Sequence, residues 1–123
     1  MLIIDDHPEI RKVIALLLRN EFDAIQSDGD ESVVNLAAEK QPALILCDAI
    51  MPRVAGHQLV AMFRSDPRTS HIPILVVSGK TEWQDWENQP IAGMLRKPFA
   101  PDDLTETVRQ ILQTGAIYVE TPA

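Results

Sequence analysis

Short apolar runs alternate along this chain with segments whose apolar residues recur every three or four positions. The runs, which predict β-strands, cover residues 1–4, 22–26, 43–47, 74–77 and 93–95. Two of them, 43–47 and 74–77, are apolar at nearly every position, which is typical of strands buried on both faces of a sheet. The alternation of strands with helical segments therefore predicts an α/β domain, in which a parallel sheet carries helices on both faces.

The periodic segments predict helices over residues 8–19, 31–40, 56–63 and 101–113, with a short, irregular helix within 79–90. Proline stands in the first turn of the first and last of these helices, and Asp28-Gly29-Asp30 is expected to cap the second. The residues expected to face the core are spaced three or four apart. They are Ile10, Val13, Ile14, Leu17 and Leu18 in the first helix, Val33, Val34, Ala37 and Ala38 in the second, Leu59, Val60 and Phe63 in the third, and Leu104, Val108, Ile111 and Leu112 in the last.

Polar side chains directly follow four of the predicted strands. Asp5 and Asp6 follow the first, Asp48 the third, Ser78 the fourth and Lys97 the fifth. Neighbouring parallel strands would open all four ends into one crevice at the carboxyl edge of the sheet. Three carboxylates held close together repel one another unless a divalent cation neutralises them, while a hydroxyl and an ammonium group suit a phosphoryl group. The pattern therefore predicts a phosphoryl-transfer site.

Composition and charge narrow the possible roles. With 11 Lys and Arg against 18 Asp and Glu, the 123-residue chain has a formal net charge of −7, which argues against direct nucleic-acid binding. No apolar stretch is as long as a membrane span, and the N-terminus has no signal-peptide pattern. The single cysteine, Cys47, excludes an internal disulfide and is expected to be a buried thiol. These features predict one domain located in the cytoplasm.

Four short motifs occur in order along the chain. They are Ile3-Ile4-Asp5-Asp6-His7-Pro8, Cys47-Asp48-Ala49-Ile50-Met51-Pro52 with Gly56, Val76-Val77-Ser78-Gly79, and Lys97-Pro98-Phe99. Taken together, they resemble the receiver domain of two-component response regulators. The resemblance implies a flavodoxin-like fold of five parallel strands in the order 2-1-3-4-5, with helices on both faces. It also implies a receiver domain over residues 1–115, with 116–123 as a C-terminal tail or the start of a linker.

The resemblance also implies a role for each residue at the acidic end of the crevice. Asp48 would be the phosphoacceptor, which receives a phosphoryl group from a sensor histidine kinase or a phosphotransfer protein. Asp5, Asp6 and Asp48, with the backbone carbonyl of Ile50, would hold Mg²⁺, which prefers oxygen ligands. His7 is expected to be a surface residue beside the site rather than a ligand.

Lys97 and Ser78 would contact the phosphoryl group once Asp48 is modified, so that the domain switches between two states. The switch would act on an output domain or effector protein, with a possible homodimer, and would turn over no external substrate. Met94 departs from the family pattern, because an aromatic switch residue usually stands there. Lys97 lies 19 positions after Ser78, a few fewer than is usual in the family. The helix expected within 79–90, the fourth of the fold, should therefore be shorter than in most members.

Two other interpretations are open. The departures at Met94 and in the fourth helix are compatible with a degenerate receiver that acts as a phosphorylation-independent interaction module. A small Mg²⁺-dependent phosphatase of the haloacid dehalogenase kind also forms an aspartyl phosphate, but its nucleophile belongs to an Asp-x-Asp pattern after the first strand, whereas Asp5 and Asp6 are adjacent.

The C-terminal residues 115–122 resemble the segment that leaves the receiver in helix-turn-helix regulators of the NarL/LuxR type.

Overall fold

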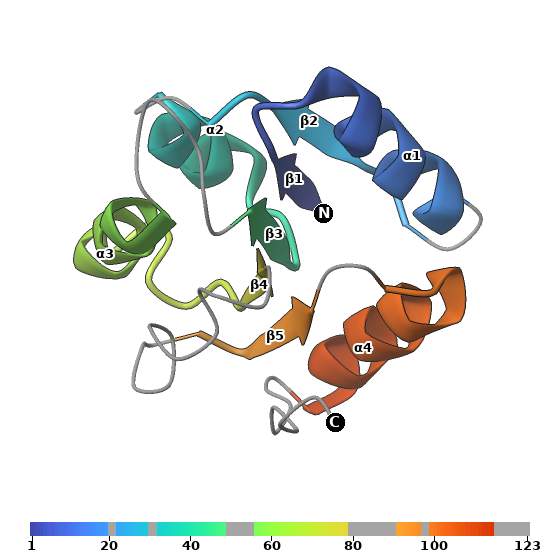
Figure 1. Ribbon diagram of the computed structural model, residues 1–123. Helices are drawn as coiled ribbons and strands as arrows, with labels where there is room; N and C mark the ends of the chain where they lie inside the picture. The colour runs from blue at the N-terminus through green and yellow to red at the C-terminus, as the bar shows by residue number, and fades with distance from the viewer. Residues whose placement is uncertain (20–21, 30–31, 49–55, 79–90, 97–98, 115–123) are drawn as a thin grey trace.

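The computed structural model describes residues 1–19, 22–29, 32–48, 56–78, 91–96 and 99–114 (Figure 1). These residues form a sheet flanked by helices. In chain order the elements are β1 (Leu2–Ile4), α1 (Pro8–Leu18), β2 (Ile25–Ser27), α2 (Val33–Lys40), β3 (Ile45–Asp48), α3 (Gly56–Ser65), β4 (Ile74–Ser78), β5 (Gly93–Arg96) and α4 (Pro101–Thr114).

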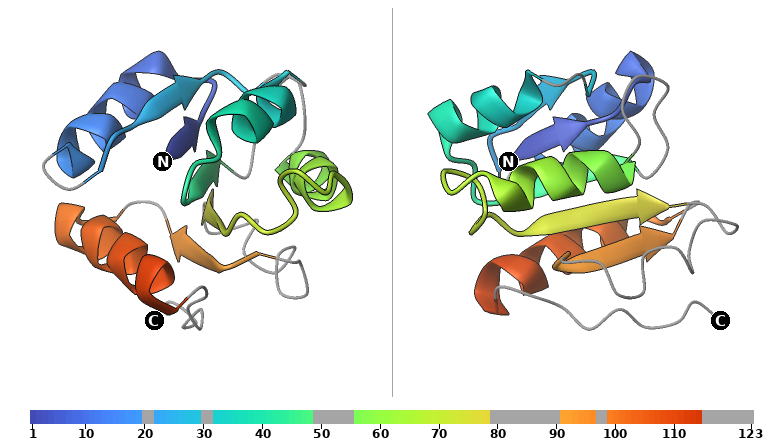
Figure 2. Two further views of the ribbon diagram at one scale, coloured as in Figure 1. Left: turned by 180° about the vertical axis from the view of Figure 1, so that it is seen from behind. Right: turned by 90° about the vertical axis from the view of Figure 1, so that its left-hand side faces the viewer.

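The five strands form one parallel sheet in the order β2-β1-β3-β4-β5, which confirms the predicted topology. Helices α1 and α4 cover one face of the sheet, and α2 and α3 cover the other (Figures 1 and 2). Because all strands run in the same direction, the carboxyl ends of β1, β3, β4 and β5 meet at one edge. Asp5, which follows β1, and Asp48, which ends β3, are thereby brought together.

Alternating residues of the central strands supply two separate cores, one under each pair of helices. Leu2 and Ile4 of β1 pack on the side of α2 and α3, and Ile3 packs on the side of α1 and α4. The predicted inward residues of α3 are all fully buried, with Phe63 the largest buried side chain. Burial of β3 and β4 on both faces explains their continuous apolar sequences.

The apolar stripe of α1 is narrower than predicted. Ile14 and Leu18 are buried and Leu17 is partly buried, but Ile10 is 36% exposed and Val13 is 55% exposed. Val13 lies about 100° around the helix from Ile14, which turns it away from the sheet. Ile10 lies in the first turn, at the end of the helix. The inward assignment of these two residues was therefore wrong.

The other helices differ from prediction at single positions. In α4, Leu104, Val108 and Ile111 are buried as expected, but Leu112 is 37% exposed, because a side chain next to Ile111 lies about 100° from it. Helix α2 begins two residues later than predicted, and its N-cap residue Ser32 makes no capping hydrogen bond through its side chain. Gly29 has a φ of 87°, which agrees with the predicted turn before α2.

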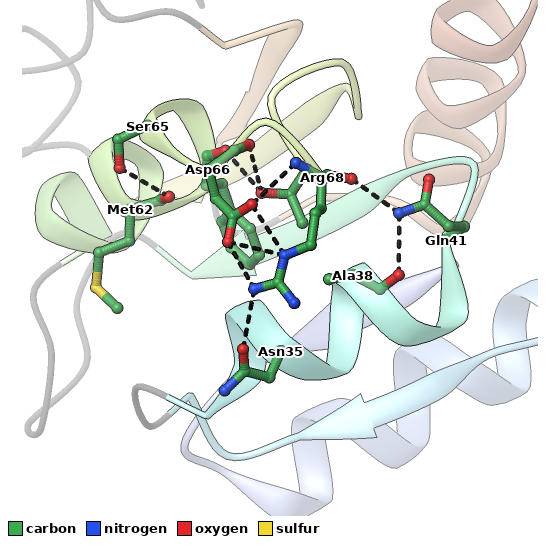
Figure 3. Close-up of polar contacts among 9 residues, drawn as sticks. Asn35, Ala38, Gln41, Met62, Ser65, Asp66 and Arg68 are labelled. Carbon is green, nitrogen blue, oxygen red and sulfur yellow. Dashed lines mark hydrogen bonds and ion pairs between the residues drawn. The ribbon is translucent and has the colours of Figure 1, made fainter.

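A polar network ties the end of α2 to the connection between α3 and β4 (Figure 3). Gln41 follows α2 in the left-handed conformation with a φ of 47°. Its Nε2 donates to the carbonyl of Ala38 at 3.1 Å and to that of Arg68 at 2.8 Å. The guanidinium of Arg68 donates to Asp66 at 2.7 Å and to Oδ1 of Asn35 at 3.1 Å. These bonds fix α2 and α3 relative to each other.

The predicted irregular helix at 79–90 lies outside the described residues, as does the segment 116–123. Strand β2 covers Ile25–Ser27, later and shorter than the predicted run at 22–26. None of the helices in the described part of the chain is long and apolar enough to cross a membrane.

Candidate metal site

The two carboxylates that follow the central strands are buried at the edge of the sheet. Asp48 is the last residue of β3, and Asp5 comes directly after β1. These strands are neighbours, with Ile4 beside Cys47 in register, so Asp5 and Asp48 stand next to each other. Asp5 is 2% exposed and Asp48 is 5% exposed. Charged groups so deeply buried are costly unless they are paired or coordinate a cation.

Asp6 joins this pair from the connection between β1 and α1. The carboxylate oxygens of Asp5, Asp6 and Asp48 and a ring nitrogen of His7 all lie within 4.8 Å of one another. The structure thus brings Asp48 together with Asp5 and Asp6, two predicted metal-ligating residues that precede it by more than 40 positions in the sequence. We name these four residues the acidic site.

Backbone and side-chain hydrogen bonds hold the β1–α1 connection in place. The backbone N–H of His7 donates to Oδ1 of Asp5 at 2.9 Å. Arg11, one turn into α1, donates from Nη1 to the backbone carbonyl of Asp5 at 2.6 Å. Proline at the first position of α1 needs no hydrogen-bond partner for its nitrogen, so the helix can begin directly beside the site.

His7 lies closer to the carboxylates than its sequence position suggested. Its Nδ1 is 3.1 Å from Oδ1 of Asp5 and 3.1 Å from Oδ1 of Asp6, although 62% of its side chain is exposed. The hydrogen bond to Asp5 and the negative charge of Asp6 raise the pKa of His7. The exposure agrees with the expected surface position. The direction of the ring could not be foreseen, because no sequence signal fixes it.

The donor set fits a hard divalent cation. Three carboxylates supply oxygen ligands, which Mg²⁺ prefers at its small octahedral sites. Oδ1 of Asp6 is buried, and no described residue gives it a well-aligned hydrogen bond; the nearby His7 ring only offsets its charge. A buried carboxylate oxygen without a donor is satisfied when a cation binds to it.

Of the remaining predicted residues, Ser78 is placed by its strand. It ends β4 and pairs in register with Arg96 of β5, at the same edge of the sheet as Asp48. The side chain of Ser78, and Lys97 and Ile50 altogether, lie outside the described residues. Met94 of β5 is 8% exposed and packs in the core on the side of α2 and α3.

Cys47 is the buried core thiol that the sequence predicted. It is 1% exposed, and its Sγ donates to the backbone carbonyl of Asp48 at 3.3 Å. Burial, together with the charges of Asp48 and Asp5, raises the pKa of the Cys47 thiol strongly. Both effects favour the protonated thiol, which is a weaker nucleophile than a thiolate.

The parallel sheet in the order 2-1-3-4-5 is the fold of receiver domains, to which the similar solved structures belong. The family model of the response regulator receiver domain matches residues 1–109. The chain therefore belongs to the response regulator receiver domain family, whose members are signalling switches of two-component systems.

Relatives of this chain agree with this assignment. It is 30% identical to the protein PilH of Pseudomonas aeruginosa over 116 residues, which cover 91% of this chain and 96% of PilH. It is 26% identical to the phosphate regulon regulator PhoB of Escherichia coli, covering 92% of this chain and 51% of PhoB. It matches only 6% of the length of histidine kinase P4 of Formosa agariphila, at 31% identity over 66% of this chain. The chain thus corresponds to the whole of one relative and to a part of others.

Solved structures show the same fold. A response regulator described as putative, from Chloroflexus aurantiacus, has a TM-score of 0.81 and 26% identity, covering 91% of this chain and 95% of that one. The chemotaxis response regulator CheY4 of Vibrio cholerae also has a TM-score of 0.81, at 24% identity, covering 89% of this chain and 95% of that one.

Proposed function

We propose that this chain is a phosphorylation-controlled switch that accepts a phosphoryl group on Asp48 in a Mg²⁺-dependent reaction. The observation that carries the proposal is the convergence of Asp5, Asp6 and Asp48, whose carboxylate oxygens lie within 4.8 Å of one another. Burial of Asp48 supports its role as the acceptor, because a water-poor surrounding strengthens the electrostatic contacts of the transferred group.

In the proposed reaction, a carboxylate oxygen of Asp48 attacks the phosphorus of a phosphohistidine on a partner protein. The new O–P bond forms as the P–N bond breaks, and the departing imidazole takes up a proton. Asp5, Asp6 and the backbone carbonyl of Ile50 would hold Mg²⁺ beside Asp48. When bound, Mg²⁺ would neutralise the charge that gathers on the carboxylates and the phosphoryl oxygens.

The phosphoryl group on Asp48 would then be read by two residues that follow neighbouring strands. Lys97 would pair with one phosphoryl oxygen, and the hydroxyl of Ser78 would donate to another. Both contacts exist only in the phosphorylated state, so they would bias the domain toward a second conformation. Met94, on β5 just before Lys97, is the candidate switch position.

The proposed partners are a sensor histidine kinase or phosphotransfer protein on one side and an output domain or effector on the other. Relatives support both kinds, because they include proteins named as histidine kinases and the transcriptional regulator PhoB. A homodimer of this chain is a further candidate for the output state.

The decisive experiment is incubation with Mg²⁺ and acetyl phosphate, read by intact mass. We expect one phosphoryl group on the wild-type chain, and none in EDTA or in Asp48→Asn. Asp102→Asn is the matched control, because it makes the same change at an exposed aspartate in the first turn of α4, and it should be phosphorylated like the wild type. A folded, Mg²⁺-bound wild-type chain that gains no phosphoryl group would contradict the proposal and favour an interaction module.

A further inference from the structure

The His7 ring is directed at the acidic site rather than along α1. His7 is the N-cap residue of that helix, yet its side chain makes no capping hydrogen bond. Instead Nδ1 lies 3.1 Å from an oxygen of Asp5 and 3.1 Å from an oxygen of Asp6. A carboxylate oxygen only accepts hydrogen bonds, so Nδ1 carries the proton in this arrangement. The hydrogen bond from Nδ1 goes to Oδ1 of Asp5, while Oδ1 of Asp6 lies equally near without a well-aligned hydrogen bond.

The distances from Nδ1 of His7 to the oxygens of Asp5 and Asp6 match the distances between ligand atoms that bind the same metal ion. Two ligands at right angles, each about 2.1 Å from a metal, are about 3.0 Å apart, and tetrahedral ligands are about 3.4 Å apart. The distances of 3.1 Å from Nδ1 to Asp5 and Asp6 fall at the lower end of this range. A metal ion bound to Nδ1 would therefore lie within reach of both carboxylates with little movement of either.

A nitrogen ligand strengthens the binding of some metal ions and not of others. Mg²⁺ prefers oxygen ligands, whereas Mn²⁺, Co²⁺ and Zn²⁺ also bind imidazole, with an affinity that rises from Mn²⁺ to Co²⁺. A site made of three carboxylates takes all of these ions, but one imidazole added to it strengthens binding of the transition ions only.

We propose that His7 is a fourth ligand of the acidic site, which binds through Nδ1 and gives the site a preference for first-row transition ions over Mg²⁺. The inference rests on the proposed function, because it uses the same three carboxylates. Binding through Nδ1 requires the neutral ring with its hydrogen on Nε2. A protonated ring therefore releases its Nδ1 proton to solvent, whereas a neutral ring with its hydrogen on Nδ1 transfers it to Nε2 through solvent. With 62% of the side chain exposed, the ring can adjust to the ion without disturbing the core.

The test compares the affinities of Mg²⁺ and Co²⁺ for the untagged, unphosphorylated chain by calorimetry, together with the visible absorption of bound Co²⁺. His7→Asn is the main variant, because asparagine is a good N-cap residue and keeps the start of α1. His71→Asn is the matched control, since His71 is an exposed histidine whose ring contacts Gln41, far from the acidic site in the fold. His7→Gln serves as a second variant should His7→Asn fold poorly.

We expect His7→Asn to weaken Co²⁺ binding at least about tenfold, the scale on which ligand-sphere changes act, and to alter the Co²⁺ absorption. Mg²⁺ affinity should change less than about twofold, and His71→Asn should change neither. With ¹⁵N-labelled histidine and Zn²⁺, the Nδ1 resonance of His7 should shift on binding.

Two outcomes would overturn the inference, and they differ in what they say about the proposed function. Equal Co²⁺ affinity in wild type and His7→Asn, with normal Mg²⁺ binding and phosphorylation, would remove His7 as a ligand and leave the receiver site intact. Failure of the wild type to bind either ion would remove the metal site itself, and the proposed function with it.

Discussion

Replacing Asp6 with asparagine is expected to make the metal-free protein more stable. In the acidic site the carboxylate oxygens lie within 4.8 Å of one another, and Oδ1 of Asp6 is buried without a well-aligned hydrogen bond from a described residue. Asparagine has nearly the same shape, removes one negative charge and adds two N–H donors. The substitution therefore removes repulsion without leaving a cavity.

The magnitude follows from the separation and the surroundings. Two unit charges 4.8 Å apart interact by about 3.5 kcal/mol at an effective dielectric constant of 20. Asp6 is 23% exposed, and the His7 ring 3.1 Å away offsets part of its charge, so solvent and histidine reduce the effect. We expect a net gain of about 1–2 kcal/mol in the free energy of unfolding, roughly 4–8 °C in Tm for a chain of this size.

The assay is urea unfolding, followed by circular dichroism, in EDTA and in saturating Mg²⁺. Mg²⁺ at 100 times its Kd should stabilise the wild type by about 2.7 kcal/mol, and Asp6→Asn by clearly less at the same concentration. Asp102→Asn is the control with the same charge change. The free energy of unfolding of Asp102→Asn should be about 0.3–1 kcal/mol lower than that of the wild type in both buffers, because Asp102 lies at the positive end of the α4 dipole. An Asp6→Asn protein that is no more stable than wild type in EDTA would refute the reasoning.

Three further predictions concern the core and the polar network. Phe63→Ala should lower the free energy of unfolding by about 3–5 kcal/mol in urea, because Phe63 is fully buried under α3; a loss below about 1 kcal/mol would contradict its place in the core. Cys47 should react with Ellman's reagent only in denaturant, since burial raises its pKa, and rapid native labelling would show that the thiol is accessible. Arg68→Met should raise the pKa of Asp66 in NMR titrations, because the hydrogen bond from Arg68 lowers it. That interaction stabilises the protein above the pKa of Asp66 in the unfolded chain, near 4, and is lost as pH falls through the lowered folded value, so the stabilities of wild type and variant should converge in acid.

The sheet could be predicted because its strands follow simple rules of burial. Strands β3 and β4 are covered on both faces, which leaves two nearly continuous apolar runs in the sequence. The edge strand β2 is only partly buried, so its pattern was weak and its bounds were misplaced. The buried face of α1 was predicted too wide for a different reason. Its exposed Val13 and Leu16 interleave with buried residues, so periodicity alone predicts too wide a buried face.

The acidic residues of the site could also be found from the sequence, because each follows an apolar run and the topology brings these ends together. The position of the His7 side chain could not be predicted in this way. Its neighbours in sequence identify its backbone position, but the orientation of its ring depends on the buried Asp5 and on the start of α1. A sequence gives no rule for that choice, and an exposed histidine is ordinarily a surface residue.

The sheet itself connects the acidic site to the face covered by α2 and α3. Cys47, Val76 and Met94 stand side by side across β3, β4 and β5, one position before the row that begins with Asp48. All three side chains pack in the core under α2 and α3. A shift of β4 or β5 toward a group on Asp48 would therefore move Met94 against that core. Methionine can repack by rotating its flexible chain, whereas an aromatic ring at this position would have to move as one rigid body. Under the proposed function, the response of Met94 to phosphorylation would be a graded repacking of the α2 and α3 face. Substitutions in that core should alter this response more than substitutions on the face covered by α1 and α4.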